Sequence, residues 1–131
     1  MIYETHITVR GYEMDSYGHV NNAVYLNYVE QCRWEILQGL DIIKLFEQRG
    51  LLLVVTEAKL RYAREAKVFD KLLIKTRMVL EGPYIIFKHR IINKDTQVKL
   101  VTGEVKTLVI NESRVPCAVP DEFKSLFEIA E

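Results

Sequence analysis

The 131-residue chain has little of several features that mark specialised classes of protein. Its two cysteines, Cys32 and Cys117, lie far apart and show no metal-like spacing. Lys+Arg and Asp+Glu number 18 each, so no overall field favours nucleic acid. No apolar run approaches the ~20 residues of a membrane span, and the first ten residues lack the apolar stretch of a signal peptide. We therefore expect a reduced, cytoplasmic protein of one domain, residues 1–131, that binds no nucleic acid, membrane or metal.

Periodicity along the chain predicts a strand, a long helix and then a sheet. Residues 2–10 alternate like a half-buried strand. Residues 11–21 have the polar, glycine-containing composition of a loop, and residues 22–38 have the spacing of a helix. After a short amphipathic segment, residues 41–50, we expect four strands in a meander and a short helical tail. The four strands span 51–64, 71–80, 84–93 and 97–110, and the tail spans 121–130.

One helix against one antiparallel sheet predicts an α+β domain. The first half of the helix is apolar almost all round, so we expect the sheet to curl around it. Asn21 or Asn22 is a natural N-cap for this helix, and Gly39 is a natural stop. An open sheet leaves an edge strand exposed, which favours pairing with a second subunit.

The stretch DSYGHVNNAVY, Asp15 to Tyr25, gathers a carboxylate, a glycine, a histidine and two amides directly before the helix. It resembles the D-x-x-G-H-V-N-N-x-x-Y pattern of the hot dog fold thioesterases of the 4-hydroxybenzoyl-CoA thioesterase type. A weaker resemblance lies in LRYAREAKVFDKLLIKT, residues 60–76, where Glu65 stands at the place of a common proline. The resemblance implies a hot dog fold, in which a curved antiparallel sheet of about five strands wraps a long central helix.

The resemblance also implies a function. Members hydrolyse acyl-CoA, or sometimes acyl-carrier-protein, thioesters, and they assemble as homodimers or homotetramers with active sites between subunits. Carried over to this chain, Asp15 is the general base or nucleophile, and a backbone N–H near Asn22 polarises the thioester carbonyl. The chemistry agrees, because a carboxylate can activate water and a helix N-terminus offers unpaired N–H groups to an oxyanion. No cofactor is implied.

Further residues near this motif are expected to bind the substrate. Gly18 allows a tight turn and a close approach of the backbone to a ligand. We expect His19 to fix the loop rather than to transfer protons, and Tyr17 and Tyr25 to line the pocket. Guanidinium and ammonium groups bind phosphate, so the candidate partners of coenzyme A are Arg61, Arg64 and Lys67.

Structural interpretations and other functions stay open. Asp15 is also a natural turn former, and alternating charges on a strand are usually a solvated face. The chain also fits a non-catalytic module that binds acyl-CoA. A hot dog enoyl-CoA hydratase is disfavoured, because such enzymes pair an Asp with a His five residues later, whereas His19 is four residues after Asp15.

Overall fold

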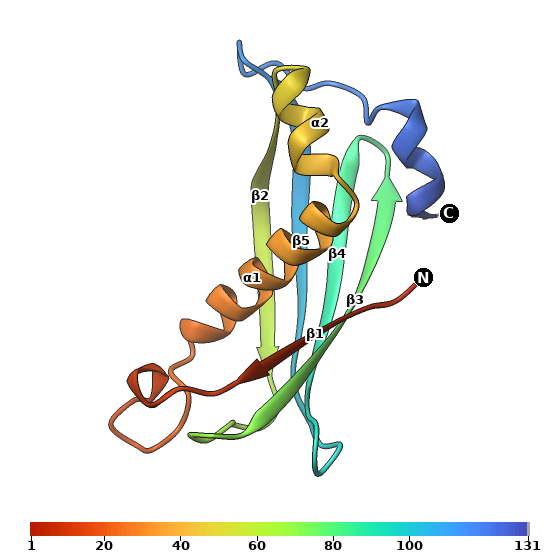
Figure 1. The fold of residues 1–131 in the computed structure, drawn as a ribbon. Coiled ribbons are helices and arrows are strands. Elements are labelled where there is room, and N and C mark those ends of the chain that lie inside the picture. Colours follow the sequence, from red (N-terminus) through yellow and green to blue (C-terminus); the bar gives the residue numbers. More distant parts are fainter. Residues whose placement is uncertain (131) are drawn as a thin grey trace.

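A six-stranded sheet carries the fold, seen here in a computed structural model that describes residues 1–130 (Figure 1). The strands are β1 (Tyr3–Thr8), β2 (Leu51–Tyr62), β3 (Lys71–Glu81), β4 (Tyr84–Asn93), β5 (Lys99–Asn111) and the short β6 (Glu128–Ile129). Their order is β1-β3-β4-β5-β2, all antiparallel, and β6 adds to β3 in parallel. The predicted α+β class is confirmed.

Alternating side chains give the sheet one buried face. In β4, for example, Phe87, His89 and Ile91 are buried, while Arg90 between them is exposed. The alternation predicted for the first strand is present too, since Thr5 is buried between two exposed neighbours. Because the strand period is two, every second residue therefore faces the helix.

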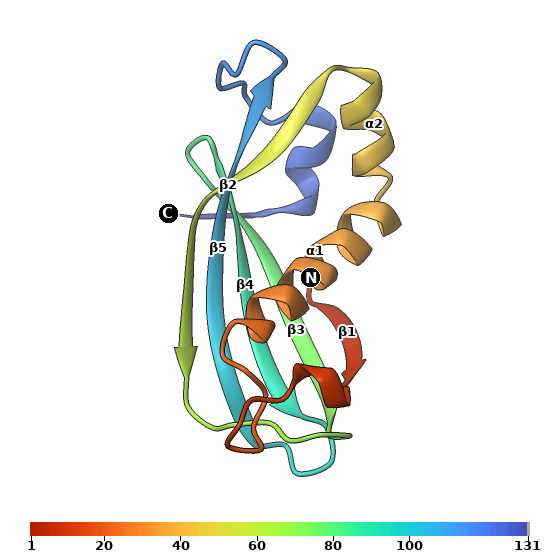
Figure 2. The same ribbon diagram turned by 90° about the vertical axis from the view of Figure 1, so that its left-hand side faces the viewer.

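Helix α1 (Val24–Gly39) crosses the buried face of the sheet and continues, after a short bend, into α2 (Ile42–Gln48) (Figures 1 and 2). Its 16 residues make it about 24 Å long. The side chains at steps of four, three and four are buried against the sheet, as the spacing predicted. They are Tyr25, Val29, Cys32 and Ile36.

The predicted meander of four strands is wrong for the first of them. Only β3, β4 and β5 follow one another in the sheet, whereas β2 pairs with β5 and forms the edge. Apolar alternation shows which face of a strand is buried but not which strand lies beside it. The expected exposed edge strand is therefore β2, whose Tyr62 end contacts Asn22 just before α1.

The start of the central helix also differs from the prediction. The helix begins at Val24, and Ala23 is its N-cap residue, without a side-chain cap. The Asn21 amide oxygen instead accepts the Ala23 N–H at 3.0 Å, one step before the helix. Asn side chains favour this local turn as readily as a cap.

Sheet curvature does not enclose the first half of α1. Leu26 is 42% exposed and, further along, Trp34 is 56% exposed. The sheet of one chain covers only one side of a helix, so the prediction of full enclosure is wrong within a single chain.

The tail departs from the predicted helix as well. It forms a 3₁₀-helix η2 (Asp121–Leu126) and then strand β6, whose following Ala130 N–H donates to the Leu80 carbonyl. Pairing with the free edge beside β3 satisfies backbone groups that a short helix leaves unpaired. Within residues 1–130, no helix has the length and apolar character needed to cross a membrane.

Candidate active site

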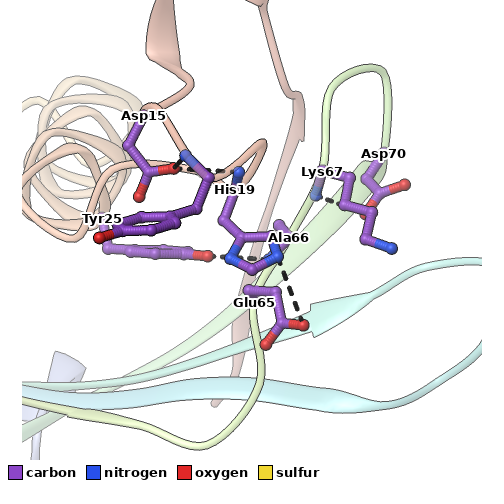
Figure 3. A network of polar contacts seen from close by, with 8 residues as sticks. Asp15, His19, Tyr25, Glu65, Ala66, Lys67 and Asp70 are labelled. Carbon is purple, nitrogen blue, oxygen red and sulfur yellow. Dashed lines mark hydrogen bonds and ion pairs between the residues drawn. The ribbon is translucent and has the colours of Figure 1, made fainter.

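The loop before α1 is built around the Asp15 carboxylate (Figure 3). Its Oδ1 accepts the backbone N–H groups of Tyr17 at 2.9 Å and His19 at 3.2 Å. The Asp15 N–H donates back to the His19 carbonyl at 2.7 Å. Gly18 closes the turn with a φ of +78°, which glycine adopts without steric cost. The carboxylate is thus held in one orientation through a single oxygen.

The second oxygen of Asp15 has no hydrogen-bond donor among residues 1–130. The carboxylate lies near the ring of Tyr25, on the first turn of α1. Burial raises the pKa of the Tyr25 hydroxyl, and the charge of Asp15 adds to that rise. Asp15 therefore combines a fixed orientation with a second oxygen that no donor of the described residues occupies, close enough to Tyr25 on the first turn of α1 for its charge to act there.

A second segment, the loop between β2 and β3, packs against the first. The Val20 N–H donates to the Ala66 carbonyl at 2.9 Å, and the Ala66 N–H donates to the Tyr25 hydroxyl at 3.0 Å (Figure 3). Glu65 lies 3.8 Å from His19 Nε2, with both side chains about half exposed. The two stretches that carried the resemblance are therefore neighbours in space. Glu65, at the place of the common proline, faces the predicted loop histidine.

The start of α1 leaves backbone N–H groups available, and that of Asn22 is the first of them along the chain. The Ala23 N–H binds the Asn21 side chain, and the Val24 N–H binds the Asn21 carbonyl at 2.9 Å. The Asn22 N–H has no acceptor among residues 1–130, while its carbonyl accepts the Tyr62 hydroxyl at 2.9 Å. Tyr62, at the end of β2, was missed from the sequence. Tyr62 lies on the same face of β2 as Leu60, two residues earlier, and this alternation in the sequence could have indicated that it faces α1.

A buried carboxylate two residues before Asp15 braces the same loop. Glu13 is 5% exposed and accepts both the backbone N–H and the guanidinium of Arg10 at 2.7 Å. It also accepts the Tyr28 hydroxyl at 2.9 Å, and its carbonyl accepts the Asn21 N–H. Burial alone would raise the pKa of Glu13, but the bonds from Arg10 and Tyr28 outweigh it and hold the pKa below its usual range. Sequence analysis did not single out this residue.

The remaining predicted residues divide between two places. Tyr17 is 83% exposed at the tip of the loop. Arg64 and Lys67 are exposed in the β2–β3 loop, on either side of Glu65 and Ala66. Arg61 instead lies on the outer face of the sheet, because it alternates with the inward Tyr62. The structure thus places Arg64 and Lys67 in the loop that packs against the beginning of α1 through Ala66, and Arg61 on the outer face of the sheet.

Comparison with known proteins agrees with this geometry. A model of the thioesterase-like superfamily matches residues 9–127. The chain belongs to this superfamily. It is 37% identical over 75 residues to the long-chain acyl-CoA thioesterase FadM of Escherichia coli strain K12, and this match covers 57% of each protein. It is 28% identical over 127 residues to the acyl-acyl carrier protein thioesterase ATL3 of Arabidopsis thaliana, covering 95% of this chain and 67% of that one.

A solved structure gives the same result for the fold. The probable thioesterase YbaW of Escherichia coli is 28% identical and superposes with a TM-score of 0.85, over 93% of both chains. The predicted hot dog fold and membership of the thioesterase-like superfamily are therefore confirmed. The matched part of this chain spans little more than half the length of FadM, and the roles of individual site residues stay predictions.

Proposed function

We propose that this protein hydrolyses an acyl-CoA thioester to a free carboxylic acid and coenzyme A. Thioester hydrolysis is the reaction that its superfamily and its named relatives support. The observation that carries the proposal is the Asp15 carboxylate, held by two backbone N–H groups with one oxygen free beside the start of α1. An acyl carrier protein is the alternative carrier, supported by the likeness to ATL3.

The geometry suits both chemical steps of hydrolysis. As a general base, the free oxygen of Asp15 takes a proton from the water that attacks the thioester carbon; the carbon–sulfur bond then breaks, and the coenzyme A thiolate that leaves takes up the proton. As a nucleophile, the same oxygen attacks the carbon and expels the thiolate, and water then cleaves the mixed anhydride that forms. In either route the Asn22 N–H and the positive end of the α1 dipole stabilise the oxyanion that forms. A lost oxyanion donor costs roughly 3–4 kcal/mol in the barrier. The Arg64 and Lys67 side chains, exposed beside this site, are the better placed candidates for the phosphates of coenzyme A.

The site lies at the open edge of the sheet, which supports assembly with a second copy. Edge strand β2 presents unpaired backbone groups, and Leu52 and Val55 on it are each 51% exposed. Leu26 and Trp34 extend this apolar surface along α1. We propose a homodimer or homotetramer in which this edge is covered. Sedimentation of an active, strictly monomeric species would contradict it.

The cytoplasmic location stays a prediction.

The test is release of free thiol from a panel of short, long and aromatic acyl-CoAs. We expect turnover of at least one substrate, and we expect Asp15→Asn to lower kcat by two orders of magnitude or more, because the amide can neither take up a proton nor attack. Asp121→Asn, at an exposed carboxylate of η2 on the opposite end of the sheet, is the matched control and should keep the full rate. A full rate in Asp15→Asn would overturn the assignment. Binding of several acyl-CoAs without turnover would favour a non-catalytic binding module.

A further inference from the structure

Two polar groups under the second half of α1 are buried without partners. Within residues 1–130, Arg33 Nη1 and His89 Nε2 have no hydrogen-bond partner. Arg33 also forms no ion pair within residues 1–130, since no carboxylate oxygen there lies within 4.0 Å of its guanidinium. Buried polar groups are almost always paired, so each exception calls for an explanation. The mechanism above uses neither residue.

The histidine is satisfied on one side only. His89 is 4% exposed, and its Nδ1 lies 2.8 Å from the Thr76 hydroxyl, which in turn contacts the Cys32 thiol at 3.1 Å. Burial lowers the pKa of His89 to about 3, and the positive charge of Arg33 adds to this effect. The ring is therefore neutral near pH 7, and the two residues are close enough for one charge to act on the other. Its Nε2 faces away from the Thr76 contact and is left unpaired.

Arg33 lines a groove that the structure leaves between α1, α2 and the edge strand β2. The groove has a volume of about 370 Å³. Apart from Arg33 and the two carboxylates Glu30 and Glu47, its walls are mostly apolar, which suits the hydrocarbon part of an acyl group. The wall residues include Trp34, Leu37, Phe46, Leu53, Val55 and Thr107.

The groove lies on the side of α1 that leads away from Asp15. Arg33 is nine residues beyond Val24, which places it about 14 Å along the helix axis from the helix start. The Tyr62 end of β2 contacts Asn22, and the Leu51 end of the same strand lines the groove. The site and the groove thus lie at the two ends of β2, so a long acyl chain laid along α1 and β2 from a thioester at Asn22 would reach Arg33, whereas a short acyl group would end before it.

We propose that Arg33 binds an oxygen-bearing group on the distal part of the acyl chain: a carbonyl, a hydroxyl or a carboxylate. This inference rests on the proposed thioesterase function and adds a substrate class to it. A guanidinium donates several hydrogen bonds and accepts none, so it selects acceptors. A site built to bond a substrate oxygen rejects the analogue that lacks it, because its own buried groups are then left unpaired.

Equilibrium binding to the Asp15→Asn protein tests the inference without requiring turnover. The probes are pairs of acyl-CoAs of equal chain length, one with a plain alkyl end and one with a hydroxyl, ketone or carboxylate near that end. We expect at least tenfold tighter binding of the oxygenated member. Adding Arg33→Met should remove the preference, and Arg33→Lys, which keeps the charge but not the fork of donors, should retain part of it. Arg49→Met, an arginine outside the groove that pairs with Glu122, should change nothing.

Two outcomes would overturn the inference. One is equal affinity for both members of each pair. The other is a preference that persists in Arg33→Met while the oligomer dissociates, which would assign Arg33 to a contact between subunits. The hydrolysis proposal can fail separately. If the wild-type protein cleaves no acyl-CoA, binding can still favour the oxygenated member of each pair, and Arg33→Met can still remove that preference. In that case only the thioesterase mechanism is wrong.

Discussion

Glu13 and Asp15 are two carboxylates separated by a single residue, and the structure surrounds them in opposite ways. Glu13 is buried and accepts three hydrogen bonds, two from Arg10 and one from Tyr28. Both of its oxygens are occupied. Such a carboxylate has no oxygen left for a substrate, and it joins the segment before the loop to the middle of α1.

Asp15 is only partly buried and accepts its hydrogen bonds through one oxygen. Both donors are backbone N–H groups of its own loop, so they fix its orientation without a neutralising cation. The two carboxylates differ in whether both oxygens accept hydrogen bonds. A carboxylate with donors on both oxygens stabilises the fold, whereas one with a free oxygen is able to react. The same criterion selects Arg33 and His89, whose unpaired atoms face no partner in the described chain.

The largest stability effect is expected at Glu13. Replacement by Gln should lower the free energy of unfolding by about 3 kcal/mol, because the buried carboxylate that accepts three hydrogen bonds becomes a neutral amide whose NH2 group faces the donors of Arg10; the guanidinium itself is half exposed, so its charge adds little. The thioesterase rate of the folded protein should fall far less than in Asp15→Asn. Urea unfolding followed by circular dichroism, together with thiol release, measures both quantities.

Asp15→Asn serves as the matched variant for this comparison. It should change the free energy of unfolding by less than about 1 kcal/mol, because the amide oxygen still accepts the Tyr17 and His19 N–H groups. The distinction between the two carboxylates would collapse if Glu13→Gln were the variant with lost turnover and Asp15→Asn the unstable one.

Much of this architecture was readable from the sequence for a physical reason. Periods of two and of about 3.6 show which residues face the core, so the strands, the helix and its buried face at Tyr25, Val29, Cys32 and Ile36 were predicted nearly to the residue. Pairing between strands is not encoded in periodicity, which is why the place of β2 was missed.

The candidate site was predictable only in part. Asp15, Gly18 and His19 share a local motif, and local turns follow directly from neighbouring residues. The contributions of Tyr62 and Glu13 depend on contacts with partners 40 and 15 residues away. His89 stands between the basic residues Lys88 and Arg90 in the sequence, yet the pleat turns its side chain into the core, opposite to both neighbours.

Lowering the pH should destabilise the protein through His89, with a smaller effect on the free energy of unfolding than Glu13→Gln. The folded-state pKa of His89 is about 3, against an ordinary value of 6.5. Between these values the unfolded chain binds a proton that the folded chain does not, so stability falls as the pH falls, by about 1.4 kcal/mol per pH unit. From pH 7 to pH 5 the wild-type protein should lose about 2 kcal/mol of unfolding free energy through this residue.

Variants assign this loss to a particular group. His89→Gln should lose less free energy between pH 7 and pH 5 than the wild type, and Asp15→Asn should follow the wild type. The lowered pKa of Glu13 acts in a different window, because its contribution is present above its ordinary value of 4.5 and is lost as the pH falls through the lower folded-state value. Glu13→Gln should therefore differ from the wild type in slope only below about pH 4.5. Equal losses from pH 7 to pH 5 in the wild type and in His89→Gln would show that the imidazole is not held neutral under α1, and the orphaned Nε2 would then have to be a protonated donor.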